Sequence, residues 1–244
     1  HMRVALVCIA KWEDTIEEWV SYHKKIGFDK VFIYQNDWDC GINDPDVTVI
    51  DFPGKHQQMP SYNHFLNNFR NDYDWAAFFD VDEYLVLKKH NNVKEFITEF
   101  DNPYGIGVNW VYFGSDGQES IIGNGKSFIS RFLKRGDMNI HVKSIINLRS
   151  NSYMTLPHNP STQLLGTNGE FFRGPFNHNG NIEIAQLNHY YHKSLEEWSK
   201  LYERGQSDHT QPKKKDDWFL LTPHNHILDK IAYEFFYKND NNRI

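Results

Sequence analysis

The first hundred residues alternate short apolar runs with segments of helical periodicity. The runs RVALVCIA, KVFIY, VTVIDF and WAAFF have the length and apolar content of buried parallel strands. PSYNHFLNNF predicts a helix with proline in its first turn. An earlier helix is predicted by apolar residues that recur on one face, namely Ile16, Trp19, Val20, His23 and Ile26. This alternation predicts βαβ units, and hence an α/β fold with a mainly parallel central sheet and helices on both faces.

The regular alternation of predicted strands and helices ends after Pro103. GIGVNWVYFGSDG, VKSIINL and IAQLNHYYH predict further strands joined by long polar loops, and SLEEWSKLYERG predicts an amphipathic helix. No repeat, linker or low-complexity segment divides the 244 residues, a length that supports one sizeable core. We therefore expect a single domain over residues 1–244, with a regular first half (1–102) and a loop-rich second half (103–244).

The stretch DWAAFFDVDEYLVL carries three carboxylates where an apolar strand ends. Asp80, Asp82 and Glu83 follow five apolar residues, and apolar residues resume at once. Carboxylates this close repel one another and cost free energy beside a buried strand, so a bound Mn²⁺ or Mg²⁺ would best offset them. On an extended segment Asp80 and Asp82 would share a face, with Val81 in the core and Glu83 turned toward a backbone amide or a basic side chain. Their repulsion predicts that Asp82→Asn keeps or even raises stability.

Ligands of open α/β sheets bind beyond the carboxyl ends of the strands. The residues that follow the apolar runs should therefore converge on one crevice beside the segment KHQQMPSYNH: Ala10, Lys11, Glu13, Gln35, Asn36, Asp37, Asp80 and Asp82. A helix N-terminus with neutral polar side chains suits a nucleotide, and paired aspartates suit a divalent cation on its phosphates. The chain has no Walker-type loop and no G-x-G-x-x-G after the first strand, which disfavours the ATP-loop and dinucleotide classes.

Composition limits the classes of partner and the compartment that we expect for this chain. A net charge of −6 argues against nucleic-acid binding. Two cysteines without metal-like spacing and the absence of a membrane-length apolar run predict a cytoplasmic protein. A basic cluster beside aromatic residues could contact an anionic membrane surface, although a solvated loop is the interpretation we favour: Lys213, Lys214 and Lys215, near Trp218 and Phe219.

Five segments together resemble a known group of enzymes. IAKWEDTIEEWVSYHKKIGFDKVFIYQND, FFDVDEYL, NWVYFGSDG, HVKSII and NHYYHKSLEEW occur in the order seen in GT-A-fold glycosyltransferases of the family-2-like and family-92 (formerly domain-of-unknown-function 23) group. The chain is also similar to viral and bacterial members that extend cell-surface or capsid glycans. The resemblance covers about residues 4–201. It implies a GT-A fold, with a nucleotide-binding first half and an acceptor-binding second half with C-terminal helices.

The resemblance also implies a reaction. A metal-dependent inverting enzyme would move a sugar from a nucleoside diphosphate donor to an oligosaccharide or glycolipid acceptor. The neutral polar residues at the strand ends offer small donor and acceptor pairs, which favours UDP or dTDP over a guanine nucleotide. Asp82 would ligate the metal directly, and Asp80 would contact the ribose, the metal or both. His189 lies late in the chain, as does the metal-binding histidine of several such enzymes. The base and ribose would contact residues near the strand ends, namely Ala10, Lys11, Glu13, Asn36, Gln58, Tyr62, Asn63 and Asp80.

The chemistry itself requires charge stabilisation and a base. Negative charge grows on the leaving diphosphate, and one unit-charge pair about 4 Å apart gains roughly 4 kcal/mol at an effective dielectric near 20. Inversion also needs a carboxylate that deprotonates the acceptor hydroxyl. Asp116 in FGSDGQE is the first candidate, followed by Glu119 and Glu170, although the Ser-Asp-Gly turn explains Asp116 equally well.

Several further residues have both a structural and a functional interpretation. Trp110 and Tyr112 alternate with Val111, so one face of this strand should join the core and the other could stack on a sugar. Lys143 in HVKSII could neutralise diphosphate charge or lie on the surface. His189 could be a metal ligand or a structural histidine, whereas His23 lies on an apolar helix face and should be a core histidine.

Two other classes compete with the transferase. A haloacid-dehalogenase-like phosphatase also carries Asp-x-Asp after an apolar strand, but there the motif ends the opening strand, whereas here it ends the fourth. A non-catalytic carbohydrate-binding module would explain the 7 Trp, 13 Tyr and 18 Phe but not the acidic triplet. Trp12 and the YQND segment depart from the resembled pattern, which leaves the base and the sugar open. The sequence indicates neither the linkage nor the oligomeric state.

Overall fold

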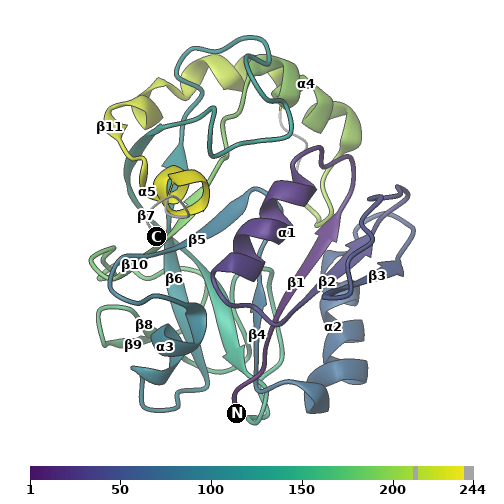
Figure 1. Ribbon diagram of the computed structural model, residues 1–244, viewed down its shortest axis with the longest axis vertical. Helices are drawn as coiled ribbons and strands as arrows, with labels where there is room; N and C mark the ends of the chain where they lie inside the picture. The colour runs from purple at the N-terminus through teal and green to yellow at the C-terminus, as the bar shows by residue number, and fades with distance from the viewer. Residues whose placement is uncertain (211–213, 239–244) are drawn as a thin grey trace.

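The computed structural model describes residues 1–210 and 214–238, and within them one mixed sheet runs through the molecule (Figure 1). Its main strand order is β3-β2-β1-β4-β7-β6-β10-β5, and β8, β9 and β11 attach beside that path. The first four strands are β1 (Val4–Ala10), β2 (Lys30–Gln35), β3 (Val47–Asp51) and β4 (Trp75–Phe78). They pair with one another in parallel, as their apolar runs predict.

The strands that follow β4 make the sheet mixed rather than mainly parallel, so that expectation was wrong. They are β5 (Glu83–Leu87), β6 (Gly105–Phe113), β7 (Lys134–Asn147), β8 (Leu164–Gly166), β9 (Phe171–Phe172), β10 (Ala185–His189) and β11 (Ile227–Leu228). The long strand β7 lies antiparallel between β4 and β6, and β5 lies antiparallel to β10. Loops rather than crossover helices join most of these strands, and such connections permit antiparallel pairing.

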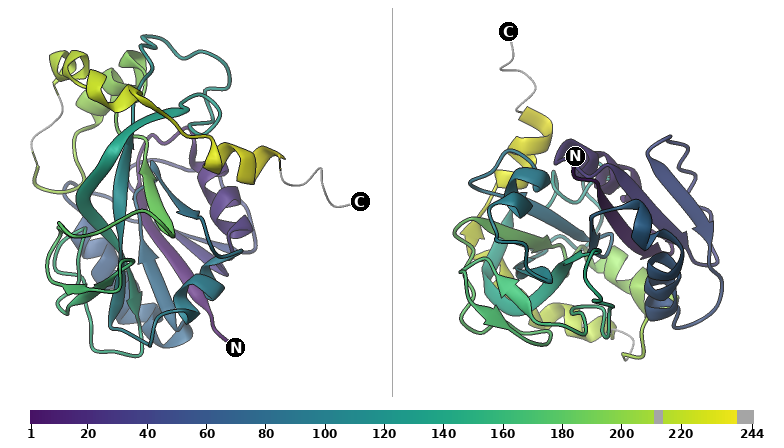
Figure 2. Two further views of the ribbon diagram at one scale, coloured as in Figure 1. Left: turned by 90° about the vertical axis from the view of Figure 1, so that its left-hand side faces the viewer. Right: turned by 90° about the horizontal axis from the view of Figure 1, so that it is seen from below.

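Helices cover both faces of the parallel part. Alternate residues of β1 enter two core clusters, one shared with α1 (Ile16–Lys25) and the other with α2 (Gln58–Phe69). The view from below in Figure 2 shows these helices on opposite sides of β1. The remaining helices are α3 (Val93–Thr98), α4 (Leu195–Arg204) and α5 (Ile231–Tyr233), with shorter turns η1 (Arg70–Asp72), η2 (Lys215–Leu220), η3 (Thr222–Asn225) and η4 (Glu234–Lys238). None of the helices in the described part of the chain is long and apolar enough to span a bilayer.

The acidic motif lies where the chain leaves one part of the sheet for another. β4 ends at Phe78 and β5 begins at Glu83, so Asp80 and Asp82 lie in a connecting turn rather than on the extended segment predicted for them. The reason is the strand order, because β4 pairs with β1 and β7 whereas β5 pairs with β10 at the end of the main path. Val81 is 1% exposed and belongs to the core, as predicted.

Candidate functional site

A cavity of about 480 Å³ opens at the carboxyl ends of β1 and β4. Both halves of the chain contribute to it, and the turn with Asp80 and Asp82 forms part of its wall. Most of the candidate residues from the sequence line this one cavity: Ala10, Lys11, Glu13, Asn36, Gln58, Asp80, Asp82, Trp110, Lys143 and His189. The structure therefore brings the predicted nucleotide, metal and sugar contacts together, as expected for the carboxyl edge of a sheet.

The acidic cluster can offer a cation several oxygen atoms. One carboxylate oxygen each from Asp80, Asp82 and Glu83 lies within 4.8 Å of the others. Glu83 is fully buried, and its Oε1 accepts a hydrogen bond from the backbone amide of Asp80 at 2.6 Å, which is the kind of partner predicted for it. Gln58 donates to Asp80 Oδ1 at 2.9 Å. Glu83 thus fixes the turn from its buried side, while the Asp80 and Asp82 side chains border the cavity.

A buried lysine lies beneath this cluster. The β4–β7 register pairs Phe78 with Ser144, so Lys143 comes beside the start of the acidic turn. Its Nζ lies 3.5 Å from Asp80 Oδ2 and 3.3 Å from Glu83 Oε1, and the side chain is 1% exposed. Burial alone would lower the pKa of Lys143, but the two carboxylates outweigh it and raise that pKa above its ordinary value. Burial likewise raises the pKa of Glu83, and Lys143 opposes that shift.

A second buried lysine, which the sequence analysis missed, pairs with Asp82. Lys193 Nζ lies 2.6 Å from Asp82 Oδ2, and the two side chains are 4% and 15% exposed. The ammonium groups of Lys143 and Lys193 therefore already offset negative charge of the carboxylates, a role that the sequence analysis gave to a metal ion. Lys193 follows the strand end at His189 by four residues, and this position could have marked it as a site residue. Its pairing with Asp82 could not be seen in the sequence, because the two residues are 111 positions apart.

His189 and its neighbours form an aromatic wall of the cavity. His189 Nε2 lies 3.5 Å from Asp82 Oδ2, and its ring centroid lies 4.4 Å from that of Trp110. Tyr191 also lines the cavity, whereas Tyr190 packs in the core, so consecutive side chains here face alternate sides, as they do along a strand, although β10 ends at His189. The Trp110 indole nitrogen is buried without a hydrogen-bond partner among the described residues.

Residues 204–210 close another side of the cavity, which the sequence analysis did not predict. Arg204 Nη1 lies 2.5 Å from Glu13 Oε1 and donates to the backbone carbonyl of Lys11 at 3.2 Å. The Gln58 amide donates to the carbonyl of Ser207 at 3.1 Å. Burial raises the pKa of Glu13, and Arg204 opposes that shift. This segment thus ties the loop after β1 to the N-terminus of α2.

The remaining nucleotide candidates lie elsewhere. Tyr62 is fully buried in the core, where its hydroxyl accepts a hydrogen bond from Gln58 at 3.1 Å. Asn63 is exposed and does not line the cavity. Asn36 lines the cavity, yet its amide donates to the carbonyls of Phe52 and Gly54 and so holds the adjacent loop.

The three candidate bases lie outside the cavity lining. Asp116, Glu119 and Glu170 are exposed. Asp116 has a φ of 49° in its turn, and its Oδ1 lies 3.1 Å from Lys134 Nζ. The structure therefore does not bring these carboxylates beside Asp80 and Asp82.

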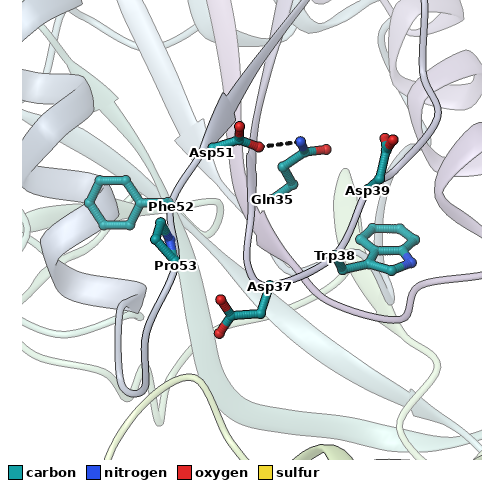
Figure 3. A pocket seen from close by; sticks show the side chains of 7 residues that line it. All are labelled: Gln35, Asp37, Trp38, Asp39, Asp51, Phe52 and Pro53. Atoms are coloured by element: carbon teal, nitrogen blue, oxygen red, sulfur yellow. Dashed lines mark hydrogen bonds between the residues drawn. The ribbon is translucent and has the colours of Figure 1, made fainter.

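A second cavity, of about 500 Å³, lies at the ends of β2 and β3 (Figure 3). It is lined by Gln35, Asp37, Trp38, Asp39, Asp51, Phe52 and Pro53. Gln35 donates a hydrogen bond to Asp51, its partner on the neighbouring strand, as Figure 3 shows. Among the described residues the two cavities share Asp37, so they adjoin there, and the second cavity contains no part of the acidic turn.

The basic cluster considered for membrane contact is only partly described. Lys213 lies outside the described residues, Lys214 and Lys215 are exposed, and Phe219 is 53% exposed. Trp218, in contrast, is buried. Membrane contact at this cluster stays a prediction.

Comparison with known proteins identifies relatives. The family model for glycosyltransferase family 92 matches residues 6–222. A glycosyltransferase family 92 protein of Ricinus communis is 31% identical over an alignment of 94 residues that covers 34% of this chain and 16% of that protein. A family 92 protein of Arabidopsis thaliana is 28% identical over 97 residues, covering 35% of this chain and 17% of that protein. The matched part thus spans less than a fifth of either relative's length.

Among solved structures, one similar chain is the 4-diphosphocytidyl-2C-methyl-D-erythritol synthase of Anaerococcus prevotii. It is 9% identical, with a TM-score of 0.37, and the match covers 64% of this chain and 81% of that one. This likeness is too weak to support an argument about fold or function.

Proposed function

Because this chain belongs to glycosyltransferase family 92, we propose that it transfers a sugar from a nucleoside diphosphate donor to a glycan acceptor. The observation that carries the proposal is the cavity in which Asp80, Asp82 and His189 lie beside the polar residues that follow β1. The family match favours a transferase over the phosphatase and the non-catalytic sugar-binding module. We further propose that residues 1–244 form one GT-A-type domain.

The residues present fit a divalent cation. Three carboxylate oxygens lie within 4.8 Å of one another, and such oxygens suit Mn²⁺ or Mg²⁺. Asp80, Asp82 and His189 would hold the ion, because Glu83 is buried and already bonded to the Asp80 amide. When bound, the ion would act as a Lewis acid on the leaving diphosphate. Lys143, whose pKa is raised by its carboxylate neighbours, keeps its positive charge beneath the turn and orients Asp80.

The donor nucleotide would occupy the side of the cavity near β1. Ala10, Lys11 and Glu13 follow that strand, and Gln58 links Asp80 to α2. These neutral and charged polar groups suit the base and ribose of a UDP or dTDP donor. The opposite wall would receive the sugars, since Trp110 offers a large aromatic ring there.

Inversion at the anomeric carbon requires a base, and Asp116 stays our first candidate, with Glu119 behind it. Both are exposed outside the cavity. Their role therefore requires that the loop after β6 reach the acceptor when the substrates bind.

The first experiment is a screen of nucleotides in the presence of Mn²⁺. UDP, dTDP and GDP are tested by thermal shift, where a ligand at a hundred times its Kd stabilises by about 2.7 kcal/mol. We expect UDP or dTDP to raise Tm only with the metal, and the matching sugar nucleotides to be consumed. Asp82→Asn is the control. If no nucleotide shifts Tm and no sugar nucleotide is consumed with Mn²⁺, the proposal is wrong.

A further inference from the structure

Lys193 places a buried ammonium group on a carboxylate that we propose as a metal ligand. Its Nζ lies 2.6 Å from Asp82 Oδ2, and the same oxygen lies 3.5 Å from His189 Nε2. A cation that binds Asp82 through this oxygen must therefore compete with Lys193. The Lys193 side chain is 4% exposed, so this contact is not an incidental pairing on the surface.

The backbone at Lys193 is held in place by several neighbours. Lys193 has a φ of 56°, a left-handed conformation that is strained for a non-glycine residue. Its carbonyl accepts a hydrogen bond from the Trp218 indole at 3.0 Å, and the next residue, Ser194, caps helix α4 with a full capping box. The ring of Phe128 lies 5.4 Å from the ammonium nitrogen. Ordering a lysine in this way also costs side-chain entropy, so holding the ammonium group at this position makes an unfavourable contribution to the free energy of folding.

We propose that Lys193 is an internal counter-ion that occupies Asp82 in the empty enzyme and transfers to the donor's diphosphate when metal and nucleotide bind together. This proposal rests on the proposed function. The diphosphate carries negative charge, so it offers the displaced ammonium a new partner beside the cation. Metal alone would have to displace Lys193 without such a replacement. The metal and the nucleotide should therefore each strengthen the other's binding, since coupling between two ligands is reciprocal.

The size of the effect follows from the contact. A hydrogen bond between charged groups changes an equilibrium constant by about ten- to a hundredfold. Removal of the ammonium group should thus tighten Mn²⁺ binding without nucleotide by about tenfold or more. The enhancement of Mn²⁺ binding by UDP should shrink by a similar factor. A purely structural defect would have the opposite sign, because a disordered site would bind Mn²⁺ more weakly.

The test is Mn²⁺ titration of the purified protein, followed by the EPR signal of free Mn²⁺, with and without saturating UDP. Wild type is compared with Lys193→Met, and Lys193→Gln serves if the methionine variant does not fold. Lys193→Arg keeps the cation and should retain the UDP enhancement. Lys55→Met is the control for general charge, because Lys55 lines the same cavity on the exposed loop before α2.

The outcomes separate this proposal from the proposed function. Tighter Mn²⁺ binding in Lys193→Met but not in Lys55→Met supports the counter-ion. Equal affinities in wild type and Lys193→Met, or equal tightening in both variants, overturn it and leave the metal site intact. Supportive Mn²⁺ data without turnover of any sugar nucleotide would contradict only the glycosyltransferase. Absence of Mn²⁺ binding in all proteins, even with UDP, would overturn both.

Discussion

Replacement of Asp82 by asparagine should destabilise the fold, which is the opposite of what charge repulsion within the motif predicts. In the structure Asp82 and Lys193 are 2.6 Å apart and mostly buried. Asparagine keeps the shape but leaves the ammonium group without this charged partner. A hydrogen bond to a charged group contributes about 1.5–3 kcal/mol, and breaking a fully buried pair costs about 3–5 kcal/mol. Because Asp82 is 15% exposed, we expect a loss of about 2–3 kcal/mol in the free energy of unfolding.

The assay is urea unfolding of Asp82→Asn, Lys193→Met and the double variant, without added metal. The double variant should be less destabilised than the sum of the two single variants, since it leaves neither charge unpaired. A coupling energy of at least about 1.5 kcal/mol would support the pair. If Asp82→Asn is as stable as wild type or more stable, relief of carboxylate repulsion outweighs the ion pair, and the reasoning fails.

Three further predictions address other contacts. Arg131→Met should cost about 3 kcal/mol, because Arg131 pairs with Glu197 at 2.5 Å with 3% of its side chain exposed. Burial alone would raise the pKa of Glu197, but Arg131 holds that pKa below its ordinary value. The ion pair therefore stabilises the fold fully above the pKa that Glu197 has in the unfolded chain. This stabilisation should be lost, in thermal melts at decreasing pH, as the pH falls through the pKa of the folded state. Burial lowers the pKa of His23 to about 3, so wild type should lose stability as the pH falls from about 6.5 toward 3, and His23→Gln should show a shallower loss. Asp116→Asn should lower kcat at least ~10²-fold if Asp116 is the base; near-normal turnover would move the role to Glu119 or Glu170.

Patterns within short stretches of the sequence predicted the strands and helices that depend on nearby residues. The apolar runs of the first half became parallel strands, and the helical spacing from Ile16 to Ile26 became α1. His23 is the core histidine expected there, with Nδ1 2.8 Å from the Trp19 carbonyl and Nε2 accepting from the Leu85 amide. Such features depend on residues a few positions apart, and their periodicity is visible in the sequence.

The pairing of the strands after β4 could not be predicted in this way. Nothing in EYLVL indicates that β5 pairs with β10, a hundred residues later in the chain, rather than with β4 beside it. Lys143 was found as a candidate, but its position under Asp80 depends on the antiparallel register of β4 and β7. Lys193 was missed for the same reason, because a charge count along the sequence does not show which lysine reaches which carboxylate.

The segment 204–210 shows how closure of the cavity is linked to the acidic turn. Gln58 donates through its side chain to Asp80 and through its backbone amide to the Ser207 carbonyl. Arg204, on the other side, pairs with Glu13 after β1. A donor that fills this cavity must contact or displace these links, so it would change the environment of Asp80 at the same time. The segment would therefore connect the proposed nucleotide site to the proposed metal ligands through Gln58, an arrangement that no single stretch of the sequence contains.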